Sequence, residues 1–258
     1  MATALITGAS GGIGKELALG FAEKGFDLVL VSRSQEKLEE VASEAKERFH
    51  VEALVLPKDL SQESFCDELA KELGEKGIEI DLLVNNAGFG DNSPFLEANY
   101  DKLDSMVRLN ISALMRLSYL FGSEMKERGK GKILNVASCA AFSSGPNMAT
   151  YYASKAFVLS FSQSLSVELK PYGVTVTCLC PGPTETGFEK AAGMKNSLMF
   201  SNPQSAKKVA KLGVKATLKG KDVVYSGPIT KGYNLLARLL PRKTAARLAY
   251  SVNKNERK

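Results

Sequence analysis

Residues 3–14 read TALITGASGGIG, and this stretch decides the fold class. Residues 3–7 form the apolar and β-branched run that is typical of a buried strand, and glycines follow at positions 8, 12 and 14. Such glycines let the backbone turn tightly and approach a pyrophosphate, while free amides and the helix dipole hold the anion. The stretch therefore predicts a nucleotide-binding strand–loop–helix unit.

Two other interpretations of this loop fail on residue identity. A P-loop would need a glycine where Ala9 stands and a serine or threonine where Glu16 stands. A nucleophile elbow is matched around Ser10, but that site needs strands upstream and a histidine late in the chain. The one histidine is His50, so the base of a hydrolase is missing.

Strand-like and helix-like segments alternate after the loop. The further predicted strands are 27–31, 51–56, 82–85, 132–137, 174–179 and 223–225. The predicted helices lie near 13–24, 35–48, 62–76, 102–128, 149–170 and 203–219. Because the strand segments are nearly continuous apolar runs, we expect a parallel sheet that is covered on both faces. The sequence predicts a doubly wound, seven-stranded, Rossmann-like α/β domain over residues 1–230, with helices on both faces.

The bulk composition is that of a globular protein with a large core. The chain has 258 residues, of which 44% are hydrophobic and 24% charged. No apolar run reaches the roughly 20 residues that a bilayer span needs, and the N-terminus lacks a basic leader, so we expect a cytoplasmic protein. Cys178 and Cys180 would share one face of a strand, which favours buried thiols over a redox or metal role. We expect no metal site and no nucleic-acid partner.

The end of the second predicted strand indicates the cofactor. NAD-binding folds place an acidic residue there to hold the ribose 2′-hydroxyl, but this chain has Arg33. A guanidinium would pair with a 2′-phosphate through charge-assisted hydrogen bonds, so the sequence favours NADP(H). The alternative is that Arg33 is only a solvated charge at a helix entry.

Tyr151 and Lys155 lie four residues apart on a predicted helix, so they share one face. A tyrosine is a poor acid–base at neutral pH, and a nearby ammonium would lower its pKa. Other polar residues stand at the ends of strands. These are Gly8, Arg33, Asp59, Asn85, Ser138 and Pro181. Since ligands of open α/β sheets bind outside the carboxyl ends of strands, we expect these residues to meet at one edge.

Together these motifs resemble the short-chain dehydrogenase/reductase family over residues 3–227. The resemblance implies that Tyr151 is the acid–base and that Ser138 binds the substrate carbonyl. It also implies that Lys155 holds the nicotinamide ribose, while Asn110 anchors a water of the proton relay. The implied cofactor contacts are Gly8, Ser10, Gly12, Ile13, Gly14, Arg33, Asp59, Asn85, Ala87, Gly88, Tyr151, Lys155, Pro181, Gly182, Thr184 and Thr186. Asp59 would contact the adenine.

The family further implies a carbonyl or alcohol substrate and assembly as a homodimer or homotetramer. The chain continues for some 30 residues after the last strand, which departs from the ketoacyl reductases of fatty-acid synthesis and puts an acyl-carrier substrate in doubt. Candidate pocket residues suggest a hydrophobic ketone or aldehyde. They are Phe89, Cys139, Phe142, Met148, Phe188, Met194 and Met199. The alternative function is a non-catalytic nucleotide-binding regulator, which the intact Ser138, Tyr151 and Lys155 disfavour.

Two segments lie outside the motifs. Residues 183–202 are a long stretch without a clear strand, which predicts a substrate lid. Residues 231–258 hold eight Lys or Arg and one Glu, and Pro241 should divide them into two short amphipathic helices. The basic side chains expected on the surface are Arg238, Arg242, Lys243 and Arg247. The leucines of this tail are expected to pack on the protein's own surface or at a subunit interface. The alternatives are weak attachment to an anionic membrane and docking of an acidic carrier protein.

Overall fold

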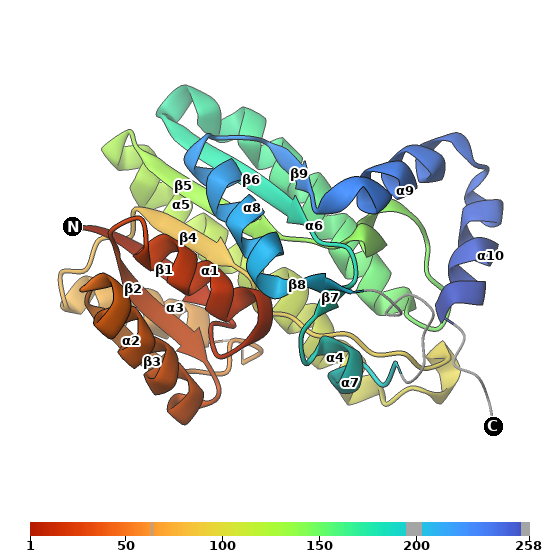
Figure 1. Ribbon diagram of the computed structural model, residues 1–258, viewed down its shortest axis with the longest axis horizontal. Coiled ribbons are helices and arrows are strands. Elements are labelled where there is room, and N and C mark those ends of the chain that lie inside the picture. Colours follow the sequence, from red (N-terminus) through yellow and green to blue (C-terminus); the bar gives the residue numbers. More distant parts are fainter. Residues whose placement is uncertain (63, 195–202, 254–258) are drawn as a thin grey trace.

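The computed structural model describes residues 1–62, 64–194 and 203–253 of the chain (Figure 1). The strands of the main sheet are β1 (Ala2–Thr7), β2 (Phe26–Ser32), β3 (Ala53–Pro57), β4 (Leu82–Asn85), β5 (Gly131–Val136), β6 (Val174–Cys180) and β9 (Val223–Tyr225). The helices that flank it are α1 (Gly12–Ala22), α2 (Gln35–Phe49), α3 (Phe65–Glu75), α4 (Tyr100–Val107), α5 (Leu114–Arg128), α6 (Ala149–Leu169) and α8 (Ala206–Leu218).

The seven strands pair in the order β3-β2-β1-β4-β5-β6-β9, and every pair is parallel. The chain therefore winds outward in two directions from β1 and β4, which confirms the predicted doubly wound sheet. Consecutive strand residues are buried on opposite faces. Ile6 packs in one layer and Leu5 in the other, so the strands need side chains that are apolar throughout.

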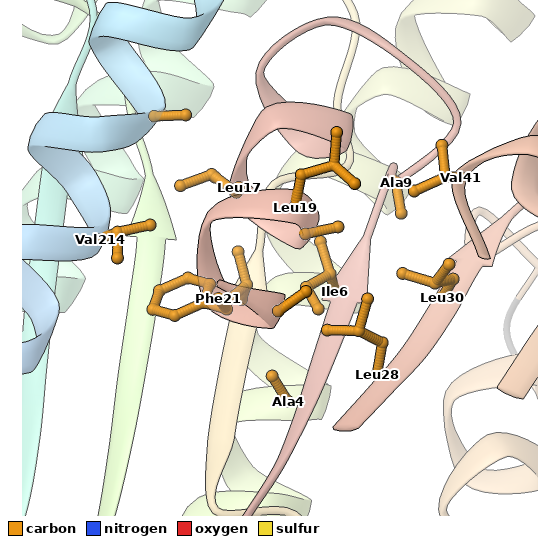
Figure 2. Packing of buried hydrophobic residues seen from close by; sticks show 14 of the residues in the cluster. Ala4, Ile6, Ala9, Leu17, Leu19, Phe21, Leu28, Leu30, Val41 and Val214 are labelled. Carbon is orange, nitrogen blue, oxygen red and sulfur yellow. The ribbon is translucent and has the colours of Figure 1, made fainter. Parts of the chain in front are cut away.

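One face of the sheet is covered by α1, α2 and α8. Figure 2 shows Ile6, Leu28 and Leu30 of the sheet among Leu17 and Phe21 of α1, with Val214 of α8 beside them. The other face is covered by α3, α5 and α6, which contribute Leu69, Phe121 and Leu165 among other residues. Both layers are closely packed, so the strand ends are held in fixed positions.

The segment predicted as one long helix over 102–128 is interrupted. Between α4 and α5, residues Arg108–Ala113 form a π-helical turn, and Asn110 lies buried within it. Such turns insert an extra residue into a helix and are frequent at functional sites. The apolar periodicity continues through this turn, which is why the sequence pattern did not reveal it.

The segment after β6 contains short elements that the sequence did not indicate. The two-residue strands β7 (Thr184–Glu185) and β8 (Gln204–Ser205) pair in parallel, and α7 (Phe188–Ala191) follows β7. The expectation that this segment contains no strand is therefore wrong. The strand β7 forms because β8, which follows the segment in the sequence, pairs with it. The predicted lid covers residues 183–202, and of these residues 195–202 lie outside the described part of the chain.

Two helices end the described chain, α9 (Gly227–Leu239) and α10 (Arg242–Asn253), with Pro241 between them as predicted. Figure 1 shows them beyond β9, at the end of the molecule opposite to β3. The helix α9 begins four residues before the predicted start of the tail at 231. None of the helices within the described residues is both long and apolar enough to traverse a bilayer.

Candidate active site

A cavity of about 510 Å³ opens at the carboxyl edge of the sheet, where the sequence placed the site. Most of the predicted site residues line this cavity. They are Gly8, Ser10, Gly12, Ile13, Gly14, Arg33, Ala87, Gly88, Ser138, Tyr151, Lys155, Pro181, Gly182, Thr184 and Thr186. These residues come from chain segments that are far apart in sequence, and the ends of β1, β2, β4, β5 and β6 bring them together.

The glycine loop forms a cradle that side chains would fill. A Cβ atom at Gly14 would lie 2.1 Å from the carbonyl oxygen of Gly8, and one at Gly8 would lie 2.8 Å from the Asn86 amide nitrogen. Gly8 also has a φ of 66°, which favours glycine. The Asn86 amide donates to the Thr7 carbonyl at 3.0 Å and holds the loop against β4. The N-terminus of α1 thus opens on the cavity without a side-chain cap.

Two cations stand at one end of the cavity, Arg33 after β2 and Lys37 in the first turn of α2. Both side chains are exposed, and neither enters an ion pair with the described residues. They can therefore converge on a phosphate. Sequence reasoning named Arg33 and missed Lys37, although a second basic residue in the first turn of the helix that follows Arg33 is a usable signal.

Tyr151 and Ser138 lie together at the inner part of the cavity. Tyr151 is only 8% exposed, and burial raises the pKa of its hydroxyl, while a hydrogen bond with Ser138 acts in the opposite direction. Ser138 lies in extended backbone after β5, and its hydroxyl accepts a hydrogen bond from the Ala140 amide at 3.1 Å. The pair can therefore present two hydroxyl groups to one carbonyl oxygen.

Lys155 is buried one helical turn from Tyr151. Its ammonium donates to the Val136 carbonyl at 2.9 Å and lies 5.9 Å from the centre of the Tyr151 ring. Burial lowers the pKa of Lys155 to about 8. The sequence argument expected this lysine to lower the pKa of Tyr151; in the free chain the desolvation of the phenol dominates instead, and its pKa is raised.

Asn110 does not line the cavity but supports it from behind. Its side-chain oxygen accepts from the Phe89 amide at 3.1 Å, and its amide donates to the Phe89 carbonyl and to Ser154. A Cβ atom at Gly88 would meet both Asn110 and the Lys155 ammonium. Asn110 therefore fixes the loop after β4 beside α6.

Two predicted cofactor residues lie away from the cavity lining. The Asn85 amide donates to Ser118 at 3.0 Å and to Asn135 at 2.9 Å within the core, and Asn86 lines the cavity in its place. Consecutive side chains along a strand point to opposite faces of the sheet. A residue one position away from the predicted one therefore points in the opposite direction. Asp59 accepts from the Ser61 amide and hydroxyl after β3, and its adenine contact stays a prediction.

The remaining wall of the cavity is apolar. Its residues include the predicted Phe89, Cys139, Met148, Phe188 and Met194. The Phe188 ring of α7 lies 5.2 Å from the Tyr151 ring, so the segment after β7 packs on this tyrosine. The prediction that Phe142 lines the cavity is wrong, because its ring contacts Tyr225 and Tyr233 outside the cavity. Met199 lies outside the described residues.

A buried asparagine that the sequence did not single out connects the C-terminus to this wall. Asn253, the last described residue, accepts from the Tyr152 hydroxyl at 3.1 Å and donates to the Pro146 carbonyl at 3.1 Å. Its own carbonyl accepts from the Asn92 amide at 3.1 Å. Sequence alone gives no signal for this role, because the partners are more than 100 residues away.

The thiols are reduced and mostly buried. Cys178 and Cys180 are fully buried on the same face of β6, as expected from their spacing, with their sulfur atoms 4.0 Å apart. All four cysteines are free. Over residues 1–62, 64–194 and 203–253, no group of three or more His, Cys, Asp or Glu side chains gathers in an arrangement that could hold a metal ion.

Comparison with known proteins identifies relatives of the same architecture. A short-chain dehydrogenase from Sphingobium yanoikuyae in complex with NADPH is 30% identical, with a TM-score of 0.83 over 92% of this chain and 93% of that one. The bulky-bulky ketone specific alcohol dehydrogenase from Comamonas testosteroni is 32% identical, with a TM-score of 0.80 over 92% and 91%.

A very-long-chain 3-oxoacyl-CoA reductase of Phaeosphaeria nodorum is 36% identical over 216 residues, which are 81% of this chain and 63% of that protein. The chain thus spans less than two thirds of the length of the curated relatives that head the comparison. The family model for short chain dehydrogenase matches residues 2–197. The chain belongs to the short-chain dehydrogenase family.

Proposed function

We propose that this protein transfers a hydride between NADP(H) and a carbonyl or alcohol group of an apolar substrate. The observation that carries the proposal is the convergence of Ser138, Tyr151 and Lys155 on the same cavity as the glycine cradle and the cations Arg33 and Lys37. A nucleotide site and an acid–base group are thereby brought within one space. The similarity to an NADPH-bound dehydrogenase supports the cofactor assignment.

The residues present fit NADP(H). The glycine cradle leaves room for a pyrophosphate against the N-terminus of α1, and Arg33 with Lys37 would hold the 2′-phosphate. Among the described residues that line the cavity, none is acidic and would repel this phosphate. When bound there, the cofactor supplies or accepts the hydride.

The side chains of the chain then handle the proton. Because its pKa is raised, the Tyr151 hydroxyl is protonated at neutral pH, which is the state that can donate to a carbonyl oxygen. Ser138 would donate a second hydrogen bond to the same oxygen and so favour its developing negative charge. The Lys155 ammonium lies close enough to stabilise the tyrosinate that remains after the transfer.

The substrate we propose is a bulky, apolar ketone, with a long-chain 3-oxoacyl thioester as the first compound to test. The apolar wall of the cavity, which includes Phe89, Met148, Phe188 and Met194, would accept an alkyl chain. Relatives that act on very-long-chain 3-oxoacyl-CoA and on bulky ketones support this class. A non-catalytic regulator finds no support in these residues.

We also propose assembly as a homodimer or homotetramer. The support is a group of exposed apolar side chains on α5 and α6, namely Met115, Tyr119 and Val167. Exposed apolar patches commonly mark contacts between subunits. Sedimentation velocity of the full chain, compared with a Tyr119→Glu variant, would measure the association.

The experiment for the proposed function is a panel of ketones, aldehydes and 3-oxoacyl thioesters assayed by the loss of NADPH absorbance. We expect turnover with apolar ketones, higher with NADPH than with NADH, and none with the Tyr151→Phe variant. Binding of NADPH without turnover of any carbonyl would instead favour the regulator.

A further inference from the structure

The helix α9 exposes an apolar side that the described residues of the chain do not cover. Ile229 is 81% exposed, Leu235 60%, Leu236 47% and Leu239 75%. At 100° per residue, these four side chains fall within about 120° of the helix circumference. The opposite side, which includes the fully buried Thr230, faces the protein. The tail leucines are expected to pack on the chain's own surface or at a subunit interface. For Leu235, Leu236 and Leu239 the first alternative is wrong, because they are exposed.

Basic side chains border this apolar stripe. Lys231 and Arg238 lie along one edge of α9, and Arg242, Lys243 and Arg247 are exposed on α10. None of the five enters an ion pair with the described residues. The sequence holds no Asp or Glu between positions 222 and 256, so the positive charge of this region is uncompensated locally.

This combination decides between the kinds of partner. An isologous contact with a second copy would bring two sets of like charges together, which is unfavourable. An acidic protein would use the charges but would not require a continuous row of exposed leucines. An amphipathic helix with an apolar stripe and basic borders matches an anionic lipid surface on both counts.

We propose that α9 and the start of α10 dock on an anionic membrane surface. The side chains of Ile229, Leu235, Leu236 and Leu239 enter the boundary between headgroups and acyl chains, and the flanking Lys and Arg contact the lipid phosphates. A short apolar stripe gives only weak binding by itself, so the attachment is reversible and depends on salt.

The docked helix also forms part of the surroundings of the cavity. Ser226, the residue before α9, accepts a hydrogen bond from the Gly182 amide at 2.8 Å, and Gly182 lines the cavity. Farther along α9, Tyr233 shares a 2.5 Å hydrogen bond with Ser143, in the loop that precedes the catalytic helix. A membrane under α9 therefore lies beside the wall of the active site.

Co-sedimentation of the full chain with vesicles tests the proposal. The vesicles are phosphatidylcholine alone or phosphatidylcholine with phosphatidylserine. We expect pelleting with the anionic vesicles only, and release as salt is raised. The leucine variant is L235S/L239S, and the charge variant is R238Q/R242Q/K243Q. The matched controls are F95S/L96S and K24Q/K71Q/K76Q, which change exposed residues on other surfaces.

Each basic residue near an anionic surface is worth roughly a five-fold change in partitioning, so the charge variant should bind on the order of 100-fold more weakly. Loss of two leucines that enter the membrane on binding should weaken binding at least about ten-fold. The controls should bind like the unchanged chain, and circular dichroism should show all variants folded.

Several results would overturn the proposal. These are failure of the full chain to pellet, equal pelleting with neutral vesicles, and unchanged binding of the leucine variant. The last result would indicate purely electrostatic docking of the kind an acidic protein uses. A change in the sedimentation coefficient of L235S/L239S without vesicles would identify the stripe as a subunit interface instead. The measurement needs no substrate, so it fails or succeeds independently of the proposed reaction.

Discussion

The two sides of the active-site cavity are held in place by different means. On the nucleotide side, the Thr7 hydroxyl accepts from the backbone amides of Asn86 and Ala87, and the Gly8 amide donates to the Val31 carbonyl at 2.7 Å. On the opposite side, α10 is attached through the small buried residues Ala245 and Ala249 and through the hydrogen bonds of Asn253.

This difference separates a rigid half from a half with low local stability. The nucleotide side is part of the sheet, so it can open only when the sheet itself unfolds. The C-terminal helices bury little apolar surface, and such elements open at a lower free energy than the core. We therefore expect substitutions on the first side to change chemistry and cofactor binding, and those on the second to change local opening.

The largest effect should come from Tyr151→Phe. Removing the hydroxyl that transfers the proton should lower kcat by about 10²- to 10⁴-fold, while NADPH affinity stays unchanged. Steady-state kinetics and fluorescence titration of NADPH measure the two quantities. Tyr152→Phe is the control, because its hydroxyl bonds to Asn253 and it should remain active. An inactive Tyr152→Phe with an active Tyr151→Phe would show that the assignment is reversed.

The next largest effect concerns the pH dependence of the free energy of unfolding of the protein without cofactor. The folded-state pKa of Lys155 is lowered from 10.5 to about 8, so the folded state holds fewer protons than the unfolded state between these values. The contribution of Lys155 to the free energy of unfolding should therefore rise by on the order of 3 kcal/mol as the pH increases from 8 to 10.5.

Urea unfolding of the unsubstituted protein and of the Lys155→Met variant, both without cofactor and between pH 8 and 10.5, would measure this pH dependence. The difference between the two isolates Lys155, because the buried tyrosines titrate in both. Lys243→Met is the control, since that side chain is exposed and its removal should leave the pH dependence unchanged. A flat difference between the free chain and Lys155→Met would contradict the prediction.

Arg33→Asp should reverse the cofactor preference. Loss of one charged contact to the 2′-phosphate typically costs about 1.5–3 kcal/mol, so the ratio of kcat/KM for NADPH over NADH should fall on the order of 10- to 100-fold. Lys37→Gln should weaken NADPH in the same direction but less. Equal affinity of the unchanged chain for both cofactors would show that Arg33 is only a solvated charge.

The smallest effect should follow Asn253→Ala. The variant leaves the Tyr152 hydroxyl and the Pro146 carbonyl without their partner, at a cost of about 1–3 kcal/mol. We expect faster amide hydrogen exchange in α10, with exchange in α1 unchanged. Ser251→Ala is the control on the exposed side of the same helix. If α1 and α10 exchanged faster together, the two halves would form one cooperative unit.

The sequence by itself determined the sheet, the position of the glycine loop and the helix that carries Tyr151 and Lys155. Continuous apolar runs require burial on both faces, and the ends of parallel strands must meet at one edge, so residues as distant as Gly8 and Ser138 could be placed together in advance. The spacing of Tyr151 and Lys155 likewise follows from local helix geometry. These inferences use short-range periodicity and a known rule of sheet topology.

Only the tertiary structure decided the features that depend on a partner far away in sequence. The π-turn at Asn110 and the pairing of β7 with β8 leave the local pattern unchanged, and the bonds of Asn253 join residues more than 100 positions apart. The direction in which the pKa of Tyr151 shifts depends on desolvation, which is a property of the packed site. The exposed leucines of α9 show the same limit, because periodicity defines an apolar face but the surrounding fold determines whether that face is covered.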